Sequence, residues 1–593
     1  MATYAGQGNV LDAKPTTQRQ RYELLRQQLE NERSSFLSHW RELGDYILPR
    51  RPRFEVTDVN KGNKRNDNIL DSTATLAART TRSGMHSGVT SPARPWKRLT
   101  TQDPESADDW EVRTWLDTVN ERMDSVFLRS NLYNSLPLVY GDMAVFGTSA
   151  MIVEEDLHKG IRTKVFPIGS YCISENSGGK VDTFVRTFRM TIRQLVEEFT
   201  DGVDLSVLSS WTQAQYHNGY TEAWVDVTHV IHPNAEYNEK ALEARFKKYR
   251  SCYYETGTAS SGGAGSYMDA ESDKKLLRVS GYDYFPVLCP RWQTNAEDAY
   301  GTSCPGMESL PDIKALQKME KRALQAVEKL VNPPMVGPSS LKSQRVSILP
   351  GDITYSDERE GQRGLRPVHD VTLRLAELSA MKAEIRDRIR RAFYEDLFLM
   401  LAAQDRPQMT AREIVERHEE KLLALGEVLE QINQDLLDPL IDITFAIMLR
   451  QGRIPPAPEA LQGAELRVQY ESIMAQAQKL VGVSAIERFT RYVGELATGT
   501  QNPETYDKAN PDELIDLYAK ALSVPTRAVR SDEEVAEIRG ARQRQVQATA
   551  MAERMQGMAK SAKDLSQASL EGDSALGRLL EQARAGQAVP VGA

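Results

Sequence analysis

Two strongly helical segments in the middle of the chain, separated by a short segment rich in glycine and proline, constrain its fold most. The first covers residues 307–331 and is stopped by the pair Pro333-Pro334, because a residue that precedes proline disfavours the helical conformation. The second covers residues 371–397. Between them, residues 335–370 contain short β-like runs. This part of the chain is therefore expected to run helix, small β-bearing segment, helix.

A third helix follows a polar break and is unusually long. It is expected to begin at Thr410, because Thr410 and Glu413 form a capping box, and to continue to about Arg450. Some 40 residues would extend about 60 Å at 1.5 Å per residue. Gly426 and Pro439 are the expected kinks.

The first 300 residues mix the two periodicities. An amphipathic helix is expected from about Thr17 to Pro49, and two more over residues 108–129 and 131–146. A period of two, typical of strands, dominates four later segments. These are residues 162–188, Trp224–Ile231, Phe246–Glu255 and Leu276–Leu288. An α+β domain is expected here.

Beyond Pro455-Pro456 the chain is predicted to be largely helical. Ser531 and Glu534 make a second capping box, which opens a helix to about Lys563. The final thirty residues are rich in alanine, glycine, serine and glutamine, and we expect them to be mobile. The predicted fold class is therefore α+β, predominantly helical.

Length and charge limit the function. A chain of 593 residues is too long for one compact core, so several domains are expected. The net charge of −9 argues against tight binding of DNA over the whole surface. No apolar run is long enough to span a membrane, no secretory signal is expected, and the four cysteines lack zinc or disulfide spacing.

The motifs of common enzymes are missing from the sequence. No phosphate-binding GxxxxGK[ST] loop, GxSxG elbow or calcium loop occurs. His418-Glu419 does not continue to a second histidine, since Leu422 stands four residues after His418. His229 and His232 are interpreted as structural. We therefore predict no catalytic residue, no metal site and no cofactor.

Four groups of residues resemble the head-to-tail connector (portal) family of podoviruses, in the same order over roughly residues 20–480. They are Asp71–Thr75 with Ser83-Gly84-Met85, Gly88 and Thr90–Trp96; Tyr140-Gly141 with Phe146-Gly147; Phe285-Pro286 with Pro290-Arg291-Trp292, Tyr300-Gly301 and Leu310-Pro311-Asp312; and Arg406–Ala411 with His418-Glu419 and Leu436–Leu440.

The resemblance implies a multidomain portal fold assembled as a dodecameric ring. In such a ring double-stranded DNA passes without sequence specificity through a central channel. The implied partners are the terminase motor, tail adaptor or nozzle proteins, and capsid and scaffolding proteins, with no membrane. The implied location is the portal vertex of the virion, after assembly in the host cytoplasm.

The order of elements fits the named parts of that fold. The expected parts are an N-terminal α+β wing (1–305), a first stem helix (306–334), a clip (335–370), a second stem helix (371–397), a channel or tunnel loop (398–409), a long kinked wing helix (410–452), a helical crown region (453–563) and a flexible tail or crown barrel (564–593).

The first stem helix carries a row of cations on one face. Four lysines fall within about 80° of arc at 100° per residue, opposite an apolar face. They are Lys314, Lys318, Lys321 and Lys329. They are candidates to meet DNA inside the channel, and the alternative is a solvated face or pairing with acids of a neighbour.

The second stem helix has one basic and one acidic edge. Its candidate subunit–subunit contacts are Lys382, Arg386 and Arg390 on one side and Glu377 and Glu384 on the other. Two different edges suit a ring in which each subunit meets its neighbours head to tail.

Two further segments are candidates for function. The polar loop Gln404-Asp405-Arg406-Pro407-Gln408 is the candidate channel loop, and the alternative is an ordinary interhelical loop. The basic run Arg50–Arg65 could touch nucleic acid, or form a solvated or protein-contacting surface. For the whole chain, the alternatives to a portal are a monomeric virion adaptor or scaffold, or a DNA-processing enzyme without a recognisable motif.

Overall fold

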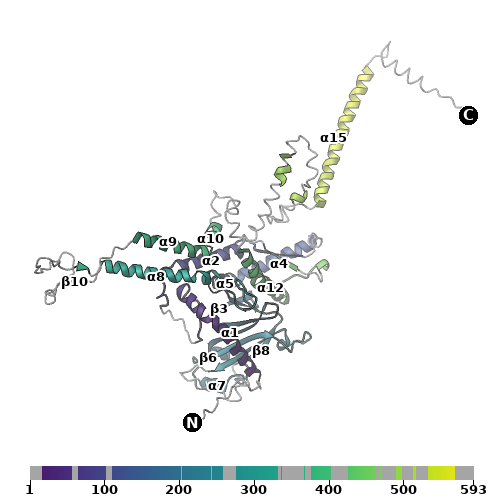
Figure 1. The fold of residues 1–593 in the computed structure, drawn as a ribbon. Helices are drawn as coiled ribbons and strands as arrows, with labels where there is room; N and C mark the ends of the chain where they lie inside the picture. Colours follow the sequence, from purple (N-terminus) through teal and green to yellow (C-terminus); the bar gives the residue numbers. More distant parts are fainter. Residues whose placement is uncertain are drawn as a thin grey trace, which may run out of the picture. The chain divides into compact units, whose positions relative to one another are not determined.

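The chain divides into two compact units, residues 1–481 and 482–593. A computed structural model describes most of the first unit and parts of the second (Figure 1). The described residues are 17–56, 64–101, 110–201, 204–241, 243–257, 275–331, 335–336, 366–367, 375–402, 425–461, 466–470, 489–493, 495–496, 510, 512–515, 530 and 532–567. The candidate channel loop 404–408 and the two predicted cap residues Thr410 and Ser531 lie outside them.

The N-terminal helices agree with their sequence patterns. Helix α1 (Gln18–Tyr46) begins at a capping box in which Thr17 and Gln20 bind each other's backbone N–H groups. Helices α4 (Trp110–Arg129) and α5 (Leu132–Phe146) confirm the two predicted after it. Helix α2 (Thr73–Val89) was not predicted, because alanine, threonine and glycine dominate it and its apolar periodicity is weak.

The largest sheet is antiparallel and has the strand order β4-β5-β6-β7-β8. Its strands are β4 (Tyr171–Glu175), β5 (Val181–Thr191), β6 (Trp224–Pro233), β7 (Tyr249–Gly257) and β8 (Arg278–Tyr282). Val185 is buried on the face covered by Tyr22 and Leu29 of α1, whereas Phe184 is buried in a different cluster. Both faces are therefore covered near β5, unlike a half-buried strand. The short helices α6 (Ile192–Phe199) and α7 (Ser210–His217), which connect β5 to β6, were not predicted.

A second, three-stranded sheet has the order β3-β2-β9. Its strands are β2 (Ala150–Asp156), β3 (Gly160–Phe166) and β9 (Val287–Leu288). A further antiparallel pair joins β1 (Lys97–Thr101) to β12 (Leu466–Tyr470). The prediction of a helical region from residue 453 is therefore wrong at 466–470, because those residues pair with a strand almost 370 positions earlier.

The two central helices lie side by side (Figure 1). They are α8 (Pro305–Val331) and α9 (Leu375–Ala392), and the described residues between them form the antiparallel pair β10 (Met335–Val336) and β11 (Arg366–Pro367). The predicted boundary at 397/398 is wrong. The helix breaks at Tyr394, whose φ is +54°, and α10 (Glu395–Ala402) begins directly after it, so residues 398–402 are helix and not loop.

The described part of the long helix runs from residue 425 to Arg450. Residues 425–432 are α-helical, Asn433–Leu437 form a π-helical turn, and α12 (Asp438–Arg450) follows. The N–H of Asp438 reaches the carbonyl of Asn433, five residues back. The irregularity lies at the predicted position, because Pro439 has no N–H to continue the regular pattern.

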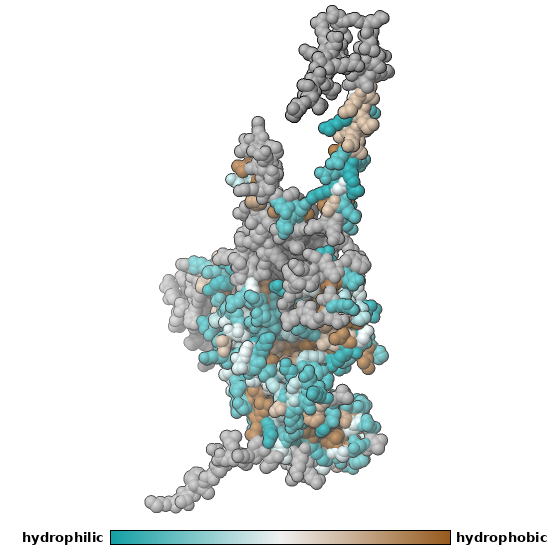
Figure 2. Space-filling view, turned by 90° about the vertical axis from the view of Figure 1, so that its right-hand side faces the viewer, coloured by the Kyte–Doolittle hydropathy of each residue, from teal (hydrophilic) through white to brown (hydrophobic). Residues whose placement is uncertain are grey.

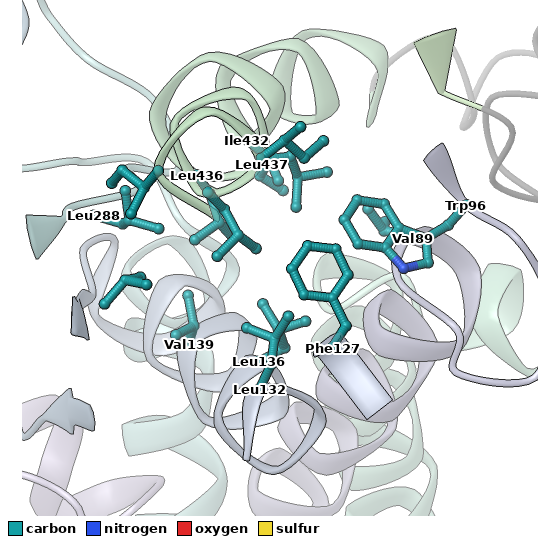
Figure 3. Close-up of a cluster of buried hydrophobic side chains, with 14 of the residues drawn as sticks. Val89, Trp96, Phe127, Leu132, Leu136, Val139, Leu288, Ile432, Leu436 and Leu437 are labelled. Carbon is teal, nitrogen blue, oxygen red and sulfur yellow. The ribbon is translucent and has the colours of Figure 1, made fainter. Parts of the chain in front are cut away.

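The π-helical turn contributes to the main hydrophobic core. Figure 3 shows Ile432, Leu436 and Leu437 on one side and Phe127, Leu132 and Leu136 on the other, with Trp96 beside them. These side chains come from α4, α5, the long helix and the segment before β1. In the second unit, α15 (Asp532–Gln567) extends four residues beyond its predicted end. Among the described residues, no helix is long and apolar enough to cross a membrane.

Candidate functional site

The four predicted DNA-facing lysines of α8 do not share one environment. Lys314 forms an ion pair with Glu42 of α1 at 2.5 Å and lies 5.8 Å from the ring centre of Tyr46. Lys318, Lys321 and Lys329 are exposed, and none has an ion-pair partner among the described residues. Lys314 is thus already neutralised, and the other three remain available for a polyanion.

Two of the predicted intersubunit cations are bound within the chain. Lys382 pairs with Glu320 of α8 at 3.1 Å. Arg386 pairs with the same glutamate at 2.8 Å and with Asp71, just before α2, at 2.7 Å. These ion pairs lock α9 to α8 and α2. The charges of both cations are therefore balanced within the chain, without acids from a neighbouring subunit.

Asp71 is the centre of this lock. Its carboxylate accepts hydrogen bonds from the Thr73 N–H and from Arg386, and its backbone binds the side-chain amide of Gln317. Burial acts to raise the pKa of Asp71, but the hydrogen bonds from Thr73 and Arg386 outweigh it and lower the pKa below its usual value. The carboxylate form of Asp71 is therefore favoured, and its ion pair with Arg386 is lost when acid protonates Asp71.

The other stem candidates lie on exposed parts of α9. Glu377 and Glu384 are exposed. Arg390 is paired with Asp387 at 3.3 Å and with Glu395 at 3.6 Å, both close in sequence. Their contact with a neighbouring subunit stays a prediction.

The far halves of the stem helices expose apolar side chains. Val327 and Leu330 are 41% and 53% exposed, whereas the buried residues of α8 all lie between Pro305 and Ala323. Leu324, Val331 and Met381 are more exposed still. Figure 2 shows that hydrophilic side chains cover most of the described surface on one face, with smaller hydrophobic patches between them. Isolated apolar residues are ordinary, but five on two adjacent helices form a surface that another protein could cover.

The basic run that begins at Arg50 is partly structural. The Arg51 guanidinium makes a two-pronged ion pair with Asp142, whose carboxylate is buried under it. The backbone N–H of Arg53 donates to Ile168. Residues 57–63 of the run lie outside the described residues. Arg51 therefore joins α5 to the loop after α1.

Three glycines, of which Gly84 and Gly147 belong to the motifs, stand where other parts of the chain approach the backbone closely. A Cβ on Gly306 would lie 2.4 Å from the Val145 carbonyl oxygen, and one on Gly147, where φ is +79°, would lie 2.4 Å from the Gly301 carbonyl oxygen. A Cβ on Gly84 would lie 2.3 Å from the Phe398 ring. These approaches bring α8 against α5 and α10 against α2, and a side chain at the glycine positions would not fit without a shift.

The motif residue Arg291 connects the sheets to the long helix. Its guanidinium is 4% exposed and binds Asp435 of the π-helical turn at 3.1 Å and Glu175 of β4 at 2.9 Å. A third hydrogen bond reaches the Gly179 carbonyl. Sequence reasoning identified Arg291 as part of a motif but did not find its partners.

The described residues contain no cluster of three or more potential metal ligands. All four cysteines are buried, and burial raises the pKa of Cys172 to about 11. His229 is stacked on Tyr253, with ring centres 3.9 Å apart, and bonds Ser251. Motif side chains such as Arg291 bind other groups of the same chain.

Comparison with known proteins identifies the class. The sequence profile of the family described as bacteriophage head to tail connecting protein matches residues 19–529. The portal protein of Salmonella phage epsilon15 is 45% identical over 561 residues, which are 94% of this chain and 97% of that protein. The probable portal protein of Bordetella phage BPP-1 is 40% identical over 525 residues, 88% and 91% of the two chains.

The chain belongs to the family of bacteriophage head-to-tail connecting proteins. Its function is that of a portal, the head-to-tail connector of a short-tailed phage, and its place is in the virion. The resemblance predicted from the motifs is thereby confirmed.

Proposed function

We propose that twelve copies of this chain close into a ring at one capsid vertex, and that DNA passes through its centre during packaging and ejection. The observation that carries the ring is the exposed apolar surface of α8 and α9, made by Leu324, Val327, Leu330, Val331 and Met381. A neighbouring copy that covers it would remove apolar surface from water in every subunit. Glu384 and Arg390 on α9 would set the relative orientation.

The role proposed for the chain is structural rather than catalytic. In this ring residues 1–305 would form the wing, α8 and α9 the stem, and residues 335–370 the clip. The clip would dock the terminase motor during packaging and the tail adaptor or nozzle proteins afterwards. The crown would begin beyond the long helix, and capsid and scaffolding proteins would contact the ring during its assembly in the host cytoplasm.

The channel proposed here holds DNA loosely. Sparse lysines on α8 and the polar loop 404–408 would face the DNA, within a chain of net charge −9. Each phosphate that a protein neutralises adds to salt-dependent affinity, so a densely basic lining would oppose translocation. This arrangement favours passage over retention.

The purified chain is expected to form hollow rings of about 800 kDa, twelve copies of 66.6 kDa, with closed cyclic symmetry. Light scattering gives the mass, and negative-stain imaging gives the symmetry and the central hole. A particle that stays near the mass of one chain, or a solid particle, would refute the ring.

Replacing Val327 and Leu330 by serine should shift the population toward smaller species if these residues lie in the interface.

The lysine row is tested by changing Lys318, Lys321 and Lys329 to glutamine. Rings should keep their mass, and the slope of log affinity for duplex DNA against log salt should fall by about 0.9 for each lost phosphate contact. The amount of DNA packaged into heads should also differ between the triple variant and wild type. The matched control is Lys314→Gln on the same helix, because Glu42 already neutralises Lys314. An unchanged slope in the triple variant would mean that these lysines form a solvated surface and do not contact DNA.

A further inference from the structure

A half-open cavity of about 440 Å³ lies where the edge strand β4 ends beside β5. Strand β4 pairs with β5 only as far as Tyr171 and Arg186, so the next residues of β5 are paired with β6 alone and border the cavity on the side that β4 leaves open. The opposite walls come from α1, from residues 53–56 and from the end of β3. No residue of the stem helices α8 and α9 lines the cavity, whereas residues 53–56 belong to the basic run Arg50–Arg65.

Arg186 faces this cavity and is held in an unusual way. Its guanidinium carbon lies 4.4 Å from the ring centre of Phe166 and 4.3 Å from that of Phe188. Two rings that contact a planar guanidinium occupy its faces and leave its N–H edge for an acceptor. The Nε of Arg186 is buried and makes no hydrogen bond with any described residue.

The positive charge at Arg186 is not balanced by the protein. No carboxylate lies within ion-pair distance of Arg186 or of Lys164, which also lines the cavity, among the described residues. Glu154, whose charge acts on both cations, is paired with Arg162 at 2.7 Å. Burial lowers the pKa of Lys164, and the adjacent Arg186 lowers it further.

Most of the other charged residues around the cavity have partners, whereas the exposed Glu55 at its edge has none among the described residues. Arg189 binds Asp226 at 3.0 Å, and Glu30 is paired with Arg26 at 2.6 Å. Arg33 donates to the carbonyls of Gly169 and Tyr171. Arg186 and Lys164 therefore stand out as two neighbouring cations that lack a counter-ion.

A further cation, Arg278, stands in the same row across the sheet as Arg186. Arg186, His229, Tyr253 and Arg278 stand directly opposite one another on β5, β6, β7 and β8. His229 is fully buried, and its Nδ1 has no hydrogen-bond partner among the described residues. Burial and then the charges of Arg186, Arg278 and Lys164 hold the pKa of His229 well below its usual value.

We propose that this cavity binds a phosphate group through the N–H edge of Arg186 and the ammonium of Lys164. Two uncompensated cations match the two negative charges of a phosphate dianion better than the single charge of a carboxylate. A guanidinium edge also matches two phosphate oxygens geometrically. The phosphate can be free or can belong to a small phosphomonoester, and bound in this place it would tie β5 to β3.

The test is binding of inorganic phosphate to the assembled full-length protein, by calorimetry and by thermal shift, with chloride as the reference at equal ionic strength. Wild type should show saturable binding. Arg186→Gln should weaken it about tenfold or more, since a two-pronged charged contact is lost, and Lys164→Gln should weaken it several-fold. Arg189→Gln is the control, because this residue lines the same cavity but is neutralised by Asp226.

A second readout separates binding from a purely structural role. In phosphate-free buffer, Arg186→Gln should leave the thermal midpoint unchanged or raise it, because an uncompensated half-buried cation is removed. A large loss of stability without phosphate would instead assign Arg186 to ring stacking and overturn the proposal. So would the absence of saturable phosphate binding by wild type, or Arg186-dependent binding of duplex DNA without binding of free phosphate.

Discussion

Replacing Arg291 by methionine is expected to lower the free energy of unfolding of the first unit by about 3–5 kcal/mol, the usual cost of removing one partner from a buried ion pair. Asp435 and Glu175 would be left facing each other across the space of the guanidinium, with 13% and 19% of their side chains exposed. Urea unfolding followed by tryptophan fluorescence measures the change, since Trp292 is the next residue and is buried. Wild type and variant must be compared at equal protein concentration, because assembly adds to apparent stability.

The partners of Arg291 make the prediction specific. The double variant Arg291→Met with Asp435→Leu should recover part of the loss, because no lone carboxylate remains beside the π-helical turn. Arg193→Met is the matched control. Its pairs with Glu197 and Glu222 are exposed and screened by solvent, so the free energy of unfolding should barely change. If Arg291→Met cost no more than Arg193→Met, Arg291 would not be what holds the long helix to the sheets.

The sequence predicts α1, α4, α5 and α8 of the first unit, where local signals define the helix, but it missed α2, α6 and α7. Thr17 and Gln20 cap α1, and the pair Pro333-Pro334 follows the end of α8. Pro439 correctly located the irregularity of the long helix, since the missing N–H acts at a fixed distance along the chain. Such signals involve residues within about one turn of each other.

The features that depend on distant contacts could not be predicted in this way. The strand Leu466–Tyr470 has its partner at Lys97–Thr101, and nothing in its own pattern identifies that partner. Tyr394 ends α9 with a left-handed conformation that a tyrosine rarely adopts, which no residue preference predicts.

The candidate stem residues show the same limit. Helical spacing predicts that Lys314 shares one face with Lys318 and Lys321, but it cannot reveal the partner Glu42, which lies 272 positions earlier. Lys382 and Arg386 likewise follow a regular helical spacing, yet their ion-pair partners, Glu320 and Asp71, lie far from them in the sequence. Spacing along a helix gives the face, and only the packing of other elements shows what that face meets.

Gly306→Ala is expected to destabilise the first unit by about 3 kcal/mol, at the upper end of the cost of overpacking a core. Gly306 stands in the first turn of α8, where the added methyl group would lie 2.4 Å from the Val145 carbonyl oxygen and 2.8 Å from its Cα. Both atoms are backbone inside α5, so they cannot rotate away, and α8 would have to move. Because α8 carries the exposed apolar surface and the lysine row, such a shift should also reduce the yield of rings, which light scattering measures.

The same substitution at Gly557 is the control for the methyl group itself. Gly557 lies inside α15, and a Cβ there would meet nothing within 4 Å. Alanine favours a helix interior over glycine by about 0.5–1 kcal/mol, so Gly557→Ala should stabilise α15 slightly, as its helical circular dichroism would report. Opposite signs for one chemical change would show that the contact with Val145, and not helix propensity, sets the cost at Gly306. If Gly306→Ala were neutral, α8 would not be anchored on α5 at this point, and the position of the stem would depend on the ion pairs of Asp71 and Glu320 with α9.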